Sequence, residues 1–188
     1  MKNQIKLLLC AASLVAAQSY GQNLVQNPGF ETGDFTAWTL TGQTSPYLNV
    51  YVSGQDYFSH TGNYYVDFGP TGPSGNIGQV ISDTVGASYV YSFWVAGNGS
   101  GESYADGYWD GNLVIATADP IAQQGYVLYS TTVVGTGSDL LQIDLFNGPS
   151  FDALDDVSLV GVPDSGSTMA MMSLGLVGLG GVARRFRR

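Results

Sequence analysis

The side chains in this sequence that could do chemistry include carboxylates confined almost entirely to one segment. Of the 15 Asp and Glu residues, 14 lie between Gln22 and Val162, and the last is Asp164. All six Lys and Arg residues lie outside that segment, so no carboxylate within it can pair with either type. Each carboxylate must therefore be solvated, accept hydrogen bonds or bind a cation. Because Ca²⁺ prefers about six to eight oxygen ligands, we predict a structural Ca²⁺ as cofactor.

The absence of Lys and Arg from this segment also excludes classes of partner. Binding to nucleic acid needs basic side chains that neutralise phosphates. Attraction to an anionic membrane surface needs them as well. We expect no nucleic-acid partner, and membrane contact only through the C-terminal tail.

Aromatic side chains form a second chemical group, because sugar rings pack their C–H faces on Trp and Tyr. The candidates for such a platform are Trp109, Tyr108, Tyr104, Tyr51 and Tyr57. The alternative is that the tyrosines are strand formers with no ligand. Trp38 and Trp94 are predicted to fill the core.

Signals for catalysis are absent. The sequence has no Gly-x-Ser-x-Gly elbow, phosphate-binding loop or His-Glu-x-x-His motif. His60 is the only histidine, which excludes a zinc-binding His cluster, and it is expected to be an exposed or capping loop residue. Two carboxylates can hydrolyse glycosides, but Asp155 and Asp156 on one regular strand would point to opposite faces. We predict a protein that is not an enzyme.

The segment that carries these residues is predicted to be all-β. No apolar pattern with a 3.6-residue period occurs before Met169, whereas alternating runs bounded by Gly, Pro, Asn and Asp recur. The predicted strands are 23–26, 38–41, 48–52, 63–68, 77–82, 88–96, 103–109, 112–116, 126–134, 140–146 and 153–160.

Two of these runs show how the strands should be oriented. Run 88–96 is apolar on both faces, as expected of a central strand. In run 140–146, Leu141, Ile143 and Leu145 should face the core, while Gln142 and Asp144 face outward.

Asp110-Gly111 separates two predicted strands and favours a two-residue type I′ hairpin. About ten short strands with such turns predict an antiparallel jelly-roll β-sandwich over residues 22–162.

The N-terminus has the features of a secretory signal peptide, which we place at residues 1–21. Lys2 and Lys6 precede an apolar run, 7–17, and cleavage is expected after Ala17 or Gly21. Cys10 lies inside this peptide, so the mature chain has no cysteine and no disulfide.

The C-terminal tail, residues 163–188, combines three features in a fixed order. A polar motif at 162–168 precedes an apolar run, 169–183, and a basic end, 184–188. The apolar run is shorter than the ~20 residues of a typical membrane-spanning helix, but local thinning accommodates short spans. The arginines keep the chain end on the cytoplasmic side, so we predict a membrane-anchoring helix.

This tail resembles the PEP-CTERM class of bacterial sorting signals. The matching motif is the Val-Pro-Asp-Ser-Gly variant, formed here by Val162, Pro163, Asp164, Ser165 and Gly166. The resemblance implies processing by an exosortase near the motif and transfer to the cell surface or extracellular matrix. An ordinary tail anchor is the alternative.

The segment before the tail resembles galactose-binding-like jelly rolls, including family-four and family-nine carbohydrate-binding modules. The resemblance rests on three motifs in order: Asn27-Pro28-Gly29-Phe30-Glu31 with a following Trp38, Ser59-His60-Thr61-Gly62-Asn63-Tyr64, and Asp155-Asp156-Val157. It implies the same fold and a capacity to bind carbohydrate.

The resemblance also implies where Ca²⁺ binds, since a calcium joins the start of such modules to their last strand. The matching ligands are Glu31 and Asp156, with backbone carbonyls near Gly33 and in 61–63. Only one of Asp155 and Asp156 should bind the metal, if the last strand is regular. The alternative is that Glu31 and Asp156 accept backbone hydrogen bonds in turns.

Together these features predict an exported, exosortase-sorted surface or matrix protein that binds extracellular polysaccharide without catalysis. A purely structural protein without a ligand is the second hypothesis, and an extracellular glycan hydrolase is the third.

Overall fold

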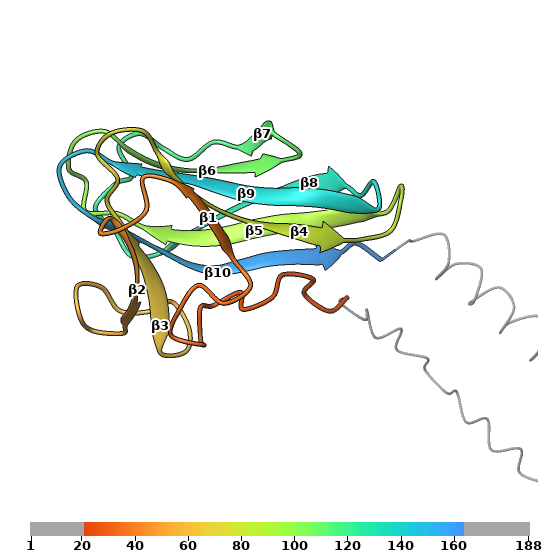
Figure 1. The fold of residues 1–188 in the computed structure, drawn as a ribbon, viewed down its shortest axis with the longest axis horizontal. Coiled ribbons are helices and arrows are strands. Elements are labelled where there is room, and N and C mark those ends of the chain that lie inside the picture. Colours follow the sequence, from red (N-terminus) through yellow and green to blue (C-terminus); the bar gives the residue numbers. More distant parts are fainter. Residues whose placement is uncertain (1–20, 164–188) are drawn as a thin grey trace, which may run out of the picture. The chain divides into compact units, whose positions relative to one another are not determined.

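Ten strands form two antiparallel sheets of five strands each in the computed structural model, which describes residues 21–163 (Figure 1). The first sheet has the order β1-β4-β9-β6-β7, and the second has the order β2-β3-β10-β5-β8. The strands are β1 (Thr39–Gly42), β2 (Leu48–Val52), β3 (Tyr64–Phe68), β4 (Gly75–Ser82), β5 (Ser88–Ala96), β6 (Ser103–Trp109), β7 (Asn112–Ile115), β8 (Val127–Val134), β9 (Ser138–Asn147) and β10 (Asp152–Gly161).

The core lies between the facing sides of the two sheets. In β5, Phe93 and Val95 are fully buried, and in β9 Leu141, Ile143 and Leu145 are fully buried, as predicted from the alternation. Full burial of each such side chain contributes about 1.5–3 kcal/mol. Since β5 lies between β10 and β8, its prediction as a central strand is also confirmed.

The β6–β7 hairpin has the predicted turn. Asp110 has φ 49° and Gly111 has φ 74°, the two left-handed residues that a type I′ turn requires. This hairpin fixes the register of β6, the strand that carries Tyr104 and Tyr108.

The predicted strand at 23–26 is not formed. Leu24 donates its backbone N–H to Leu159 of β10, but the Asn23 side-chain oxygen accepts from the N–H groups of Val25 and Leu159. When a side chain accepts hydrogen bonds from backbone N–H groups, those groups are not available for the backbone pairing of a regular strand. The segment therefore runs beside β10 as an irregular stretch.

The all-β sandwich is otherwise as predicted. Within residues 21–163 no helix is long and apolar enough to cross a membrane. The predicted signal peptide, the apolar tail run 169–183 and the basic end lie outside the described residues.

Candidate functional sites

A bulge in β10 directs two neighbouring carboxylates to one side. Asp155 pairs with Trp94 and Ser158 with Ser92, so two residues of β10 stand opposite one residue of β5. The extra residue is Asp156, which has φ 48°. The expectation that Asp155 and Asp156 point to opposite faces is therefore wrong, because it assumed a regular strand.

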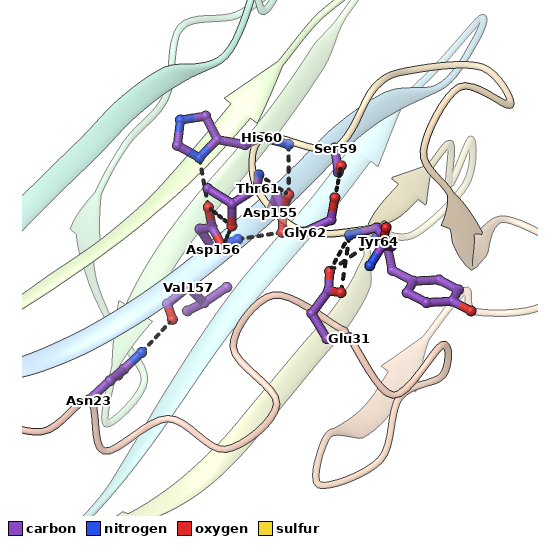
Figure 2. A network of polar contacts seen from close by, with 11 residues as sticks. Asn23, Glu31, Ser59, His60, Thr61, Gly62, Tyr64, Asp155, Asp156 and Val157 are labelled. Carbon is purple, nitrogen blue, oxygen red and sulfur yellow. Dashed lines mark hydrogen bonds and ion pairs between the residues drawn. The ribbon is translucent and has the colours of Figure 1, made fainter.

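Both carboxylates bind the loop 59–63 (Figure 2). The Asp155 carboxylate accepts from the backbone N–H of His60 at 2.8 Å and of Thr61 at 3.3 Å. The Asp156 carboxylate accepts from the Thr61 hydroxyl at 2.8 Å and contacts Nδ1 of His60 at 2.7 Å. Asp155 is fully buried, and burial together with the adjacent Asp156 charge raises its pKa to about 7.

Glu31 reaches the same loop from the other side (Figure 2). Its carboxylate accepts from the backbone N–H of Asn63 at 2.9 Å and of Tyr64 at 3.0 Å. Gly62 makes this approach possible, because a Cβ there would lie 2.2 Å from Oε1 of Glu31. Glu31 thus accepts backbone hydrogen bonds, as expected under the alternative to Ca²⁺ binding. Asp156 instead contacts the side chains of His60 and Thr61.

The surroundings of Gly29 test whether these residues suit Ca²⁺. A Cβ built on Gly29 would lie 3.1 Å from Oδ1 of Asp156, 3.6 Å from Oδ1 of Asp155 and 3.7 Å from Cγ of Glu31. Two carboxylates thus lie close to one backbone position without a neighbouring Lys or Arg, while the Glu31 carboxylate lies against Gly62 of the adjoining loop. Their oxygen chemistry suits Ca²⁺. No three His, Cys, Asp or Glu side chains in residues 21–163 are grouped closely enough to hold a metal by themselves, so backbone carbonyls would have to complete the shell.

His60 and Trp94 stack on each other. Their ring centroids are 3.9 Å apart at an interplanar angle of 19°. Trp94 alternates with the buried Phe93 and Val95, so it lies on the outer face of the second sheet. The prediction that Trp94 fills the core is wrong. Trp38 is in the core, as predicted.

Trp109 is not available as a platform for sugar. Its side chain is 7 % exposed, belongs to the core and donates its indole N–H to the carbonyl of Val134 at 3.2 Å. Trp109 shares its side of β6 with the buried Ala105 and Gly107, which fixes its inward direction. The prediction that Trp109 binds a ligand is therefore replaced: Trp109 is a packing residue of the core.

Tyr51 and Tyr57, two other candidates for a sugar platform, lie at the second sheet. Both pack edge-on against the buried Tyr65, on the outer side of β3. Tyr57 also lines a pocket of about 530 Å³ at one end of the sandwich, together with Phe151 and Asn98. Its hydroxyl donates to the carbonyl of Phe151 at 3.1 Å.

Tyr104 and Tyr108 alternate with the buried residues of β6 and lie on the outer face of the first sheet. Tyr104 pairs with Phe146 of β9, and their rings stack with centroids 5.3 Å apart at 14°. Tyr108 pairs with Gln142, whose other neighbour is Gly78 of β4, a residue without a side chain. The side chains of Tyr104, Tyr108, Gln142 and Phe146 are partly exposed.

Two acids lie between these aromatic positions. Asp106 of β6 stands directly opposite Asp144 of β9. The Asp144 carboxylate accepts from Nε2 of Gln142 at 2.6 Å, and the Asp106 carboxylate accepts from the backbone N–H of Thr117 at 2.9 Å. Burial and the Asp106 charge raise the pKa of Asp144. We call Tyr104, Asp106, Tyr108, Gln142, Asp144 and Phe146 the β6–β9 face.

Of the six residues of this face, only Tyr104 and Tyr108 were singled out from the sequence as binding residues. Gln142 and Asp144 were expected to point outward, which is correct, but nothing placed them beside Tyr104 and Tyr108. The strand order β4-β9-β6 does so. A search for outward polar residues on a strand able to pair with a Tyr-bearing strand would have found them.

The comparisons with known proteins agree with the predicted sorting motif and with the predicted jelly-roll fold. The family model of the VPDSG-CTERM motif matches residues 161–186. This chain carries a VPDSG-CTERM motif. The motif implies an exported, surface-directed protein, and the predicted motif residues 162–166 lie within the match.

Most of the similar solved structures are carbohydrate-binding modules, some of them attached to enzyme domains. TmCBM61, solved with β-1,4-galactotriose, aligns with a TM-score of 0.58 at 22% identity over 73% of this chain and 97% of that chain. The CBM22-1 xylan-binding domain of Paenibacillus barcinonensis Xyn10C aligns at 0.54 and 16% identity over 77% and 97% of the two chains. The C-terminal family 22 module of Clostridium thermocellum Xyn10B aligns at 0.54 and 12% identity over 79% and 98%.

At these identities the likeness establishes the jelly-roll fold. A search of curated protein sequences found no match.

Proposed function

We propose that this protein is a non-catalytic glycan-binding protein of the cell surface or extracellular matrix, and that it binds sugar on the β6–β9 face. The observation that carries the proposal is the stacked pair Tyr104–Phe146 on the outer side of a sheet. Aromatic carbon next to amide and carboxylate oxygens suits sugar, whose rings have apolar C–H faces and polar rims. The fold shared with carbohydrate-binding modules supports this reading.

The tail supplies the second part of the proposal. An exosortase cuts the precursor near Pro163 after the apolar run has anchored it in the inner membrane. The VPDSG-CTERM match supports this route. The mature domain then remains at the surface, where extracellular polysaccharide is the partner.

The third part is a structural Ca²⁺ held by Glu31 and Asp156, with Asp155 added as a ligand because of the bulge. The closeness of the Asp155 and Asp156 carboxylates to Gly29, and the binding of Glu31 to the same loop 59–63, support it. A cation there would replace the unfavourable like-charge contact of Asp155 and Asp156 by attraction. It would also tie the N-terminal segment to β10.

Binding of oligosaccharides to the exported protein tests the first part. Tyr104→Ala and Phe146→Ala should each weaken binding by at least about fivefold, since an aromatic contact of this kind contributes about 1 kcal/mol or more. Tyr57→Phe in the pocket at the end of the sandwich is the matched control and should bind as the parent does.

Three outcomes would contradict the proposal. No glycan bound by a folded parent protein would favour the purely structural hypothesis. Binding lost in Tyr57→Phe and kept in Tyr104→Ala would move the site to the pocket. Release of shorter products from a bound glycan would favour a hydrolase.

A further inference from the structure

The charges on the β6–β9 face distinguish between classes of glycan. We propose that this face selects glycans that carry free amino groups, such as polymers of de-N-acetylated hexosamine, over neutral and acidic glycans. The inference rests on the proposed function and goes beyond it by naming the ligand class.

The first argument is the direct opposition of Asp106 and Asp144. Residues paired in this way on neighbouring antiparallel strands have Cβ atoms about 4.5–5.5 Å apart, and like charges in that arrangement destabilise the sheet. Every partner of the two carboxylates is neutral: Gln142, and the backbone N–H and hydroxyl of Thr117. Hydrogen bonds are therefore made, but the negative charges are not compensated.

The second argument is that no cationic side chain of the segment 22–162 lies beside Asp106 and Asp144. The segment 22–162 contains no Lys or Arg. Its single histidine, His60, contacts Asp156 of the second sheet. Glu102 adds a further negative charge near Tyr104. An ammonium group of the ligand is thus the group that relieves the repulsion between Asp106 and Asp144.

The third argument is the position of the aromatic rings. The pair Tyr104–Phe146 lies two residues along the strands from Asp106–Asp144, a distance of about 7 Å, and Tyr108 lies two residues beyond on the other side. One sugar can therefore rest on aromatic carbon while an amino group of the same or the next sugar reaches the acids. Ammonium groups are also attracted to aromatic faces, whereas carboxylates and sulfates of acidic glycans are repelled by the acids.

The experiment compares three soluble probes of similar length by titration calorimetry: a chitosan hexamer, its fully N-acetylated counterpart and an oligogalacturonate. At about pH 6 the free amines are largely protonated. We expect the chitosan hexamer to bind at least about tenfold more tightly than the acetylated hexamer, because hydrogen bonds to charged groups are the stronger kind. The oligogalacturonate should not bind.

Variants separate selective binding from general attraction to an acidic protein. Asp106→Asn and Asp144→Asn should abolish the preference for the chitosan hexamer while they keep the weaker binding of the acetylated hexamer. Asp34→Asn removes the same charge from an exposed position outside both the face and the pocket beside Tyr57, and it should leave the preference unchanged. Both face variants keep the side-chain shape and remove a like-charge contact, so their thermal stability should not fall.

Equal or tighter binding of the acetylated hexamer would overturn the inference and leave the proposed function standing. An equal loss of chitosan binding in Asp34→Asn and Asp144→Asn would also overturn it, because the attraction would then be unspecific. Absence of binding by all three probes and by a neutral glycan array would refute the proposed function itself.

Discussion

Asp67 of β3 is a carboxyl group with no favourable partner. It is 1 % exposed, and its Oδ1 has no hydrogen-bond partner among the residues that the structure describes. Burial first, and then the charges of Asp56 and Asp152, raise its pKa to about 7. In the unfolded chain the pKa of an Asp is near 3.9.

This shift predicts how stability depends on pH. Between about pH 4 and pH 7 the folded protein holds a proton on Asp67 that the unfolded chain has released, so stability falls as the pH rises through this window. A difference of about three pKa units corresponds to roughly 4 kcal/mol across the window. In Asp67→Asn this part of the pH dependence should vanish.

Thermal unfolding of parent and Asp67→Asn at about pH 4.5 and pH 8 measures the effect. The gap between the two melting temperatures should shrink in the variant. Glu102→Gln is the control, because it removes an exposed carboxylate that is not among the causes of the Asp67 shift, and it should keep the gap. A gap that is the same in parent and Asp67→Asn would mean that Asp67 is ionised in the folded protein at pH 4.5.

Gly62 illustrates how one missing Cβ positions a side chain. It has φ 63°, and a Cβ there would overlap the Glu31 carboxylate. Gly62→Ala should therefore lower the free energy of unfolding by more than about 2 kcal/mol, from backbone strain and from loss of the Glu31 contacts.

Gly86→Ala is the matched control, because Gly86 has φ 78° and no atom lies within 4 Å of its added Cβ. That variant should show the strain alone, about 1–2 kcal/mol. Equal losses in urea unfolding of the two variants would show that Glu31 contributes nothing through this loop.

At the level of the strands, the alternation of apolar residues predicted most of the sandwich. It succeeded in β5 and β9 because one side of each strand is buried between the sheets. It failed at Asp156, because a bulge depends on a neighbouring segment: the N–H of Val157 next to it bonds to the carbonyl of Pro28. The sequence also assigned Trp94 to the core and Trp109 to a sugar platform. The structure reverses both assignments, which were hard to make because the strands that carry these residues have aromatic residues on both faces.

For the proposed Ca²⁺ site, the sequence predicted two of the residues but not their arrangement. The resemblance named Glu31 and Asp156, and the structure places both against the loop 59–63. Asp155 joined them only through the bulge. The β6–β9 face could not be anticipated as a unit, because the pairing of β9 with β6 brings together residues that are nearly forty positions apart in sequence.

The proposed Ca²⁺ belongs to this level, because it would join the N-terminal segment to β10. Saturating Ca²⁺ should raise the melting temperature relative to a chelator by roughly 5–10 °C, from a stabilisation of about 2.7 kcal/mol at a hundred times the dissociation constant. Glu31→Gln and Asp156→Asn should lose most of the rise. A rise of the same size in both variants would remove the metal from these residues.

At the level of the whole molecule, positive and negative charges lie in different parts of the chain. All basic residues lie at the two ends, and the segment between them is acidic. We propose that the ends direct the chain across and into a membrane, which leaves the acidic segment to interact with neutral or cationic partners.

Sorting predicts a defined fate for the C-terminus. Replacing Arg184, Arg185, Arg187 and Arg188 by Ser should release or misorient the precursor, because the arginines hold the chain end on the cytoplasmic side. Pro163→Ala should block processing in cells that contain the exosortase. Mass spectrometry of surface-extracted protein measures both, and a mature parent protein that still ends in Arg188 would refute processing.

The central claim is that sugar binds on the β6–β9 face, and a crystal structure of the protein with a bound oligosaccharide tests it most directly. We predict sugar rings in contact with Tyr104 and Phe146, with polar groups within hydrogen-bond distance of Asp144 or Gln142. An oligosaccharide bound instead in the pocket beside Tyr57 and Phe151, with the β6–β9 face free of sugar, would contradict the account.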